Sequence, residues 1–239
     1  MTYQADLFKG RRALVAGATQ GIGAVIANHL AALGAQVTAI GLGDGDGTLD
    51  ATIEVKQADV TSAESVDAAL APIGRLDIVF NCAGIIQRGA EHDLEVFQKV
   101  LAVNLTGTMR VCTATRERLK ASGGCIVNTA SMLSFFGGGL VPGYAASKGG
   151  VAQLTKSLAI AYAADGIRVN AIAPGWIATP LTKALQDDPA RAGPILARTP
   201  LGRWGTPDDV ARAAMFLCTP AASFMTGVIL PVDGGYMVA

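Results

Sequence analysis

The chain has 239 residues, with 19 Lys and Arg residues against 19 Asp and Glu residues, and 51% of it is hydrophobic. This length suits a single domain over residues 1–239, and the hydrophobic content suits buried parallel strands. A balanced charge without runs of one sign excludes a broad basic surface, so we expect no nucleic-acid partner.

The N-terminal region lacks the apolar core of a signal peptide, so we expect a cytoplasmic protein. Residues 121–147 carry no charge, but six glycines and a proline there argue against a membrane span, and we expect no membrane partner. Four cysteines and two histidines show no metal-ligand spacing. We therefore expect free thiols and no bound metal.

Strands and helices are predicted in alternation along the chain. Short apolar runs predict strands at residues 12–17, 36–40, 52–57, 76–80, 125–131, 167–173 and 228–232. Helical periodicity predicts helices at 22–33, 94–120, 144–164 and 207–218, and Thr61-x-x-Glu64 predicts a capping box that starts another. No full helix fits between the second and third strands. The pattern predicts a doubly wound, Rossmann-type α/β domain with a parallel sheet of about seven strands.

A glycine-rich turn joins the first strand to the first helix. It reads Gly17-x-x-x-Gly21-Ile22-Gly23. Glycines at such a turn let the backbone approach a pyrophosphate, whose charge is favoured at a helix N-terminus. A tight turn without any ligand is the alternative that the motif alone leaves open.

The residues after the second strand bear on the choice between NAD and NADP. An acidic residue there would hold ribose hydroxyls, and a basic one would hold a 2′-phosphate. The chain has Gly41 and Leu42, then Asp44 and Asp46, and no Lys or Arg from residue 34 through 55. We therefore predict NAD as the cofactor, with NADP disfavoured.

A Tyr-x-x-x-Lys pair opens the helix predicted at 144–164. This spacing puts Tyr144 and Lys148 on one face of the helix, one turn apart. An ammonium near a phenol favours the phenolate, so we expect the pKa of Tyr144 to lie below that of free tyrosine. Such a phenol can exchange a proton with a substrate, and Ser131 can hydrogen-bond the same substrate oxygen. A pair of side chains on the helix surface, without a catalytic role, is the plainer interpretation of the spacing by itself.

Taken together and in this order, the motifs closely resemble the short-chain dehydrogenase/reductase family over nearly the whole chain; they are Gly17-x-x-x-Gly21-Ile22-Gly23, Asn81-Cys82-Ala83-Gly84, Asn104, Ser131, Tyr144-x-x-x-Lys148 and Pro174-Gly175. The resemblance implies a catalytic set of Asn104, Ser131, Tyr144 and Lys148. It also implies that Asn104 distorts its helix and holds a water that contacts Lys148. Ala16 and Cys82 depart from the family's usual threonine and asparagine.

The resemblance further implies which residues hold the cofactor, with Asp59 and Val60 at the adenine and Ile177 and Thr179 at the carboxamide. The full set expected is Gly17, Thr19, Gln20, Gly21, Ile22, Gly23, Gly41, Leu42, Asp59, Val60, Asn81, Ala83, Gly84, Tyr144, Lys148, Pro174, Gly175, Ile177 and Thr179. N-capping of the next helix is the alternative role for Asp59.

The expected activity is an NAD(P)-dependent interconversion of a secondary alcohol and a ketone. Residues 131–135, 202–205 and 86–88 are similar to bacterial dehydrogenases of deoxy-sugar acids of the 2-deoxy-gluconate and keto-deoxy-gluconate type, which favours a sugar, sugar acid or polyol. Ser131, Tyr144 and Arg88 are the expected substrate contacts. A 3-oxoacyl thioester reductase and a non-catalytic nucleotide-binding regulator are the alternatives. A sugar-nucleotide epimerase is disfavoured, because its added C-terminal domain has no counterpart here.

Two expectations concern the molecule as a whole. By resemblance, the long helices at 94–120 and 144–164 should pack against symmetry mates in a homotetramer. Residues near 180–205 should form a lid over the substrate.

Overall fold

A computed structural model describes residues 3–239. Its centre is a parallel sheet of seven strands in the order β3-β2-β1-β4-β5-β6-β7. The strands are β1 (Arg12–Ala16), β2 (Gln36–Gly41), β3 (Glu54–Gln57), β4 (Ile78–Asn81), β5 (Cys125–Thr129), β6 (Arg168–Pro174) and β7 (Ile229–Val232). The predicted doubly wound sheet is confirmed.

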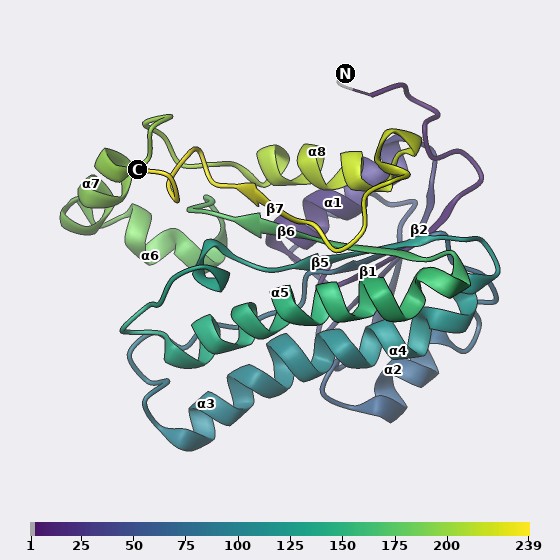
Figure 1. The fold of residues 1–239 in the computed structure, drawn as a ribbon, viewed down its shortest axis with the longest axis horizontal. Helices are drawn as coiled ribbons and strands as arrows, with labels where there is room; N and C mark the ends of the chain where they lie inside the picture. The colour runs from purple at the N-terminus through teal and green to yellow at the C-terminus, as the bar shows by residue number, and fades with distance from the viewer. Residues whose placement is uncertain (1–2) are drawn as a thin grey trace.

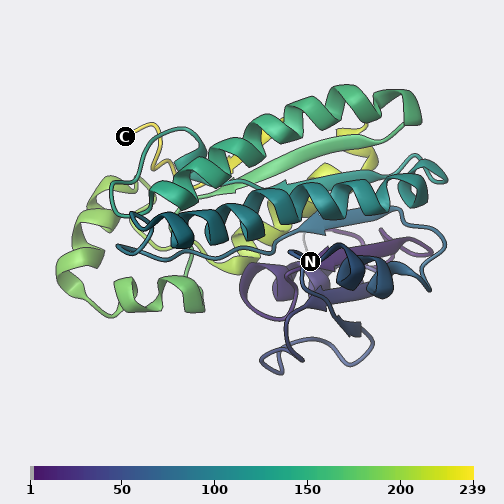
Figure 2. The ribbon, with the colours of Figure 1, turned by 90° about the horizontal axis from the view of Figure 1, so that it is seen from below.

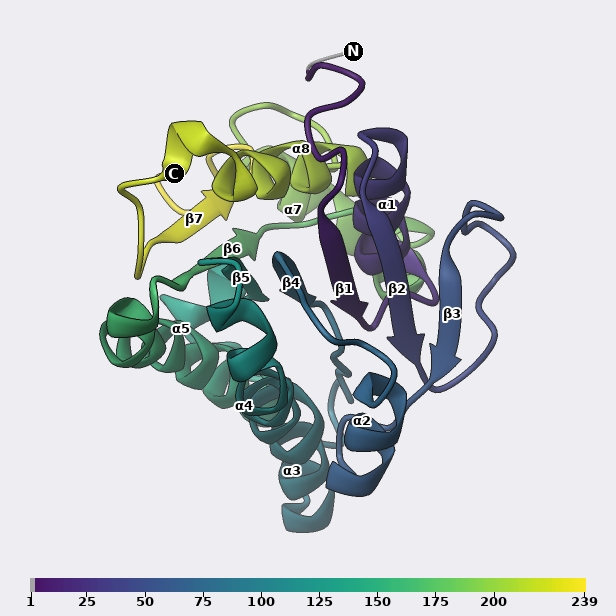
Figure 3. The same cartoon turned by 90° about the vertical axis from the view of Figure 1, so that its right-hand side faces the viewer.

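Helices cover both faces of this sheet. Helices α1 and α8 pack on one face, and α2, α4 and α5 pack on the other, with α3 against α5 (Figures 1 and 3). The helices are α1 (Gly21–Ala32), α2 (Ala63–Leu70), α3 (Leu94–Leu101), α4 (Gly107–Lys120), α5 (Pro142–Tyr162), α6 (Lys183–Gln186), α7 (Pro189–Arg198) and α8 (Pro207–Cys218).

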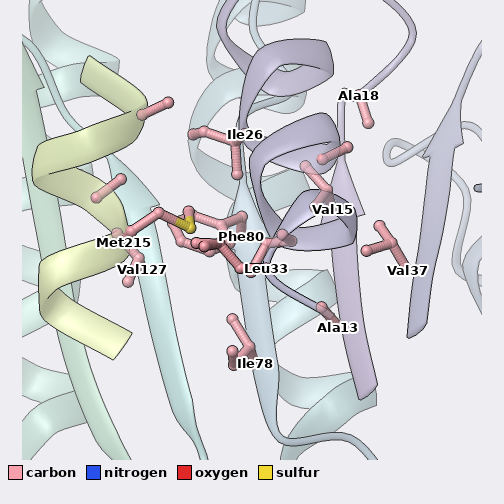
Figure 4. Close-up of a cluster of buried hydrophobic side chains, with 14 of the residues drawn as sticks. Ala13, Val15, Ala18, Ile26, Leu33, Val37, Ile78, Phe80, Val127 and Met215 are labelled. Carbon is pink, nitrogen blue, oxygen red and sulfur yellow. The ribbon is translucent and has the colours of Figure 1, made fainter. Parts of the chain in front are cut away.

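The strands form where apolar runs can be buried on both sides. Every residue of β4 is buried, as is every residue of β1 after Arg12. Between the sheet and the helices α1 and α8, Phe80, Ile26, Leu33 and Met215 pack into one cluster (Figure 4). The edge strand β3 differs, because its sequence Glu-Val-Lys-Gln is largely exposed and pairs only with β2. Charged residues on an edge strand oppose pairing with other chains.

Two predicted helix features differ in the structure. The predicted helix at 94–120 is interrupted by a π-helical segment, Ala102–Thr106, which separates α3 from α4. Helix α2 is capped by Ser62, whose side chain accepts the Ser65 N–H, so the predicted cap at Thr61 is wrong. Thr61 instead donates to Asp59 through its own N–H and hydroxyl at 2.8 and 2.7 Å, which removes it from the helix. As predicted, no helix lies between β2 and β3.

The segment predicted to form a lid lies beyond one end of the sheet. It contains a 3-10 turn, Pro180–Thr182, followed by α6 and α7 (Figures 1 and 2). Within residues 3–239, no helix has both the length and the apolar character that crossing a membrane requires.

Candidate active site

Tyr144 and Lys148 lie one turn apart near the start of α5. Pro142 is the first helical residue, where its missing N–H and fixed φ suit a helix start, so Tyr144 falls in the first turn. The Lys148 ammonium lies 5.6 Å from the centroid of the Tyr144 ring. Lys148 is only 3% exposed and donates to the Thr129 carbonyl at the end of β5, at 2.7 Å. The helix and the strand end thereby fix the lysine beside the phenol.

Ser131 joins this pair from the loop that follows β5. It is buried and caps a short 3-10 turn, accepting the Leu133 N–H at 3.1 Å. Ser134 accepts the Ser131 N–H at 3.2 Å and donates to the Lys148 carbonyl at 2.6 Å. The loop is therefore tied to α5, which brings the predicted Ser131, Tyr144 and Lys148 together.

The pKa of Tyr144 differs from the prediction. Burial raises it above the ordinary value and the charge of Glu91 adds to the rise, while a hydrogen bond from the Ser131 side chain acts against both. Burial also lowers the pKa of Lys148, to about 8. The prediction of an easily ionised Tyr144 is thus wrong for the protein without ligands, because desolvation of the phenol outweighs the hydrogen bond from Ser131.

Asn104 lies in the π-helical segment and is fully buried. Its side chain accepts the Ile85 N–H at 2.8 Å and donates to the Ile85 carbonyl at 3.0 Å and to the Ser147 hydroxyl at 3.0 Å. A Cβ on Gly84 would lie 3.4 Å from the Asn104 carbonyl oxygen and 3.6 Å from the Lys148 ammonium. The helix distortion expected at Asn104 is confirmed, and the water beside Lys148 stays a prediction.

The turn at Gly17–Gly23 has the shape that a dinucleotide requires. A Cβ on Gly17, at φ +77°, would lie 2.3 Å from the Ala83 nitrogen, and one on Gly23 would lie 2.1 Å from the Gly17 oxygen. Gly21, at φ +60°, has open space around it. Gln20 precedes α1 without a capping side chain, and the first turn holds no acidic residue. The free N–H groups and the dipole of α1 therefore fit a pyrophosphate.

Beyond β2, the side chain of Thr19 occupies the space beside Gly41. A Cβ on Gly41 would lie 2.7 and 2.9 Å from the methyl and hydroxyl of Thr19. Leu42 is exposed. Asp44 accepts a hydrogen bond from Gln57 at 3.1 Å, and Asp46 accepts from Thr48. Two carboxylates therefore follow the end of β2.

The predicted adenine contacts lie at the end of β3. Asp59 forms a local turn with Thr61 and does not cap α2, so its alternative role is excluded. Arg110 on α4 donates to the Val60 carbonyl, and Gly107 allows α4 to approach Val60 closely. Sequence reasoning missed Arg110 and Gly107, because nothing in the helical pattern distinguishes them.

Buried polar side chains connect the ends of the central strands. Asn81 donates to Asn128 at 2.8 Å, and Asn128 donates to Thr155 on α5 at 3.0 Å. Cys82 accepts a long hydrogen bond from Thr129 at 3.6 Å, and burial raises its pKa to about 11, so the thiol is unreactive. Ala83 lies against the Gly17 turn.

The Pro174–Gly175 turn lies at the end of β6. A Cβ on Gly175 would lie 2.6 Å from the Cβ of Asp233, so the last turn of the chain packs against it. The Ile177 carbonyl accepts the Thr182 hydroxyl at 2.6 Å, and Thr179 caps the 3-10 turn Pro180–Thr182. The two predicted carboxamide contacts therefore also fix the start of the segment predicted to form a lid.

Arg88 lies in the loop after β4, and no ion pair forms with it within residues 3–239. Burial lowers its pKa, the charge of Arg191 on α7 lowers it further, and Glu91 opposes this. Arg88 is thus close enough to α7 for the charge of Arg191 to act on it. No pattern in the sequence signals Glu91 or Arg191, which occur in polar segments typical of solvated surface.

A separate cavity of about 330 Å³ lies at the ends of β6 and β7, lined by Trp176, Arg203 and Asp233 among others. None of Ser131, Tyr144 and Lys148 lines it, so this cavity is distinct from the candidate site that these three side chains form. Within the described part of the chain, no cluster of three or more His, Cys, Asp or Glu side chains is placed to hold a metal. Fold and site together define a Rossmann-type dinucleotide-binding protein.

Comparison with known proteins specifies the class further. The family model described as enoyl-(acyl carrier protein) reductase matches residues 17–237. The 2-dehydro-3-deoxy-D-gluconate 5-dehydrogenase of Bacillus subtilis (strain 168) is 43% identical, over 99% of this chain and 99% of that protein. The galactitol 2-dehydrogenase (L-tagatose-forming) of Cereibacter sphaeroides is 40% identical over 96% of each chain.

Solved structures agree with this assignment. An Agrobacterium tumefaciens protein with bound NADP, described as a candidate 2-deoxy-d-gluconate 3-dehydrogenase, superposes with a TM-score of 0.92 at 42% identity, covering 99% of this chain and 100% of that one. The chain belongs to the short-chain dehydrogenase/reductase family. It is an NAD(P)-dependent oxidoreductase that acts on CH–OH groups.

Proposed function

We propose that this oxidoreductase interconverts a secondary alcohol and a ketone on a sugar acid, with Tyr144 as its proton-transfer residue. The observation that carries the proposal is the convergence of Tyr144, Ser131 and Lys148 at the carboxyl end of β5, the same edge of the sheet at which the Gly17–Gly23 turn follows β1. Ligands of open α/β sheets bind at that edge.

In reduction, Tyr144 donates its phenolic proton to the substrate oxygen, and in oxidation its phenolate accepts it. Ser131 donates a hydrogen bond to the same oxygen and orients it. Lys148, held by Thr129, supplies positive charge that favours the phenolate once substrate and cofactor are bound. Asn104 holds the proton path toward solvent. The bound nicotinamide supplies the hydride acceptor or donor.

The residues that fit the cofactor are the turn from Gly17 to Gly23 for the pyrophosphate, and Asp59 and Val60 for the adenine. We propose NAD over NADP, because Asp44 and Asp46 follow β2 and a 2′-phosphate needs a cation there. Two similar proteins, from Agrobacterium tumefaciens and Beutenbergia cavernae, carry NADP in their solved structures. The comparison of the two cofactors is therefore part of the test below.

Arg88 is the proposed partner of the substrate carboxylate. Support comes from its place beside the lid and from the names of the relatives, among them 5-keto-D-gluconate 5-reductase of Escherichia coli at 37% identity. A guanidinium can bind a carboxylate through two parallel hydrogen bonds. A 3-oxoacyl thioester is the second candidate substrate, because the family model that matches the chain takes its description from acyl carrier protein chemistry.

We further propose that residues 180–205 close over the substrate as a lid, that the protein is cytoplasmic, and that it forms a homotetramer. The contacts of Arg198 on α7 favour the proposal of a lid. Its guanidinium lies 4.4 Å from the ring centroid of Tyr236 and 5.5 Å from that of Phe136. Such contacts are weak enough to break and reform during turnover.

The test is an assay of the purified protein against sugar acids, sugars, polyols and 3-oxoacyl thioesters, with NAD and NADP each at subsaturating concentration. We expect the highest kcat/KM for a sugar acid with NAD. Tyr144→Phe should lower kcat about 10²- to 10⁴-fold because it removes the proton donor. Tyr162→Phe removes a hydroxyl from the same helix and is the matched control. Turnover of Tyr144→Phe at the rate of Tyr162→Phe would refute the proposed role.

A further inference from the structure

A buried carboxylate, that of Glu91, lies between the loop that carries Arg88 and the start of α5, which carries Tyr144. Glu91 is 1% exposed, in the segment between β4 and α3. No Lys, Arg or His side chain pairs with it within residues 3–239. A buried carboxylate is costly unless other groups satisfy it, so its hydrogen bonds indicate its role.

Both oxygens of Glu91 accept backbone N–H groups. One oxygen accepts from Gln87, the neighbour of Arg88, at 2.8 Å. The other accepts from Tyr144 itself, at 2.7 Å. One side chain therefore connects the loop that carries the proposed substrate arginine to the residue that carries the proposed catalytic phenol.

The start of α5 requires such an acceptor. The first N–H groups of a helix have no partner within the helix, and the N-cap residue Val141 has no polar side chain to supply one. Glu91 satisfies one of these groups from a distant part of the chain. Its negative charge is also favourable at the positive end of the helix dipole.

Two further contacts fix the same pair of segments. Gly89 donates to the Leu140 carbonyl at 2.7 Å, and a ring nitrogen of His92 lies 2.9 Å from the Gly139 oxygen. A Cβ on Gly143 would lie 3.3 Å from Glu91 and 3.2 Å from the Phe97 ring, so the carboxylate sits in a closely packed place. The carboxylate cannot shift without moving α5.

We propose that Glu91 is a positioning residue, which holds Tyr144 at a fixed place relative to the Arg88 loop so that a substrate bound at one end presents its oxygen at the other. This proposal rests on the proposed function of Tyr144 and Arg88. It adds a residue that touches neither substrate nor cofactor to the set that turnover requires.

A pH profile separates positioning from a merely structural role. The groups that face Tyr144 are Glu91, whose charge raises the pKa of the phenol, Ser131, which lowers it, and Lys148, 5.6 Å from the ring. The charge of Glu91 also acts on Arg88, whose pKa it raises. Removing that charge while keeping the side chain's shape should therefore lower the pH at which Tyr144 ionises.

Glu91→Gln removes the charge and keeps the shape of the side chain. The amide oxygen can accept one of the two N–H groups, from Gln87 or Tyr144, but the amide nitrogen is a donor and cannot accept the second. We expect kcat/KM to fall about 10²-fold, the size of loss that a displaced catalytic group causes. The pH midpoint of alcohol oxidation should move lower. Glu91→Asp keeps the charge and shortens the reach, so it should lose kcat with an unchanged midpoint. Exposed Glu95→Gln, on α3, should change neither.

A second measurement needs no substrate. The Tyr144 phenolate can be titrated by ultraviolet absorbance, as the difference between each protein and its Tyr144→Phe derivative. A lower midpoint in Glu91→Gln supports the proposal even if the substrate class is misassigned. The same midpoint in wild type and Glu91→Gln would overturn it, as would full activity of Glu91→Gln. If Glu91→Gln does not fold, full activity of Glu91→Asp would overturn it instead.

Discussion

The buried ammonium of Lys148 lowers the stability of the folded protein. Burial lowers the pKa of its ammonium from 10.5 to about 8. Between these two values the unfolded chain binds the proton and the folded chain does not. The free energy of unfolding therefore rises with pH across that window through Lys148, and below about pH 8 the full cost of the buried charge applies.

The prediction is a pH-dependent difference between the cofactor-free wild type and Lys148→Met. From about pH 7.5 to about pH 9.5, the wild type should gain on the order of 2 kcal/mol relative to the variant. Urea unfolding at the two pH values measures this difference. A difference that stays constant with pH would mean that Lys148 keeps an ordinary pKa in the fold.

At the residue scale, the sequence identified the groups but not their environments. Tyr144 and Lys148 follow from helical spacing, and the structure brings them together. The direction of the Tyr144 pKa did not follow, because burial depends on what the rest of the chain packs around the phenol. Gly41 is a similar case. From the sequence, the glycine indicates only that a side chain for the ribose is missing. The structure shows why it is missing, because Thr19 occupies the space that a side chain at position 41 would need.

At the scale of elements, α4 depends on one close approach. Gly107 is the first residue of α4, and a Cβ there would lie 2.8 Å from a methyl group and 3.1 Å from the Cβ of Val60. Gly107→Ala should therefore push α4 away from the proposed adenine contact. We expect the KM for the cofactor to rise several-fold and thermal stability to fall.

The matched control for this prediction is Gly74→Ala, because a Cβ on Gly74 meets nothing within 4 Å. Val60→Ala in the Gly107→Ala background removes the methyl groups that the new side chain meets, and it should restore part of the affinity. Initial-rate kinetics and thermal unfolding of the wild type and these three variants measure both effects. An unchanged KM for the cofactor in Gly107→Ala would show that the contact between Gly107 and Val60 does not affect cofactor binding.

The elements themselves were largely predictable from hydrophobic patterning, whereas the break in the helix at 94–120 was expected only from the family resemblance at Asn104. Buried strands follow from apolar runs such as Ile78–Asn81, because a parallel sheet covered on both faces requires them. The π-helical break at Ala102–Thr106 left no mark in the helical periodicity, since an added residue shifts the pattern only locally. Thr61 fits a capping box as well as Ser62 fits a cap, and the turn made by Asp59 decides between them.

At the scale of the whole molecule, the outer faces of α4 and α5 carry apolar side chains. Ile160 on α5 is 81% exposed and Met109 on α4 is 38% exposed. An isologous contact between such faces would bury them, and the proposed homotetramer is expected from light scattering at micromolar concentration. Ile160→Lys should shift the protein toward smaller species, and Val55→Lys on the edge strand β3 should not. A wild-type monomer would contradict the assembly.

The strand order has a consequence for how the protein folds. Five of the six pairings join strands that follow one another along the chain, and β1 with β4 is the exception. Closing that pairing brings together segments with β2, β3 and α2 between them, which makes it, with the pairing of β6 and β7, one of the two longest-range contacts of the sheet. The Gly17 turn meets Ala83 at this junction. Refolding chains should therefore recover helical circular dichroism before they recover affinity for a dinucleotide, because the proposed nucleotide site forms only when this long-range contact closes.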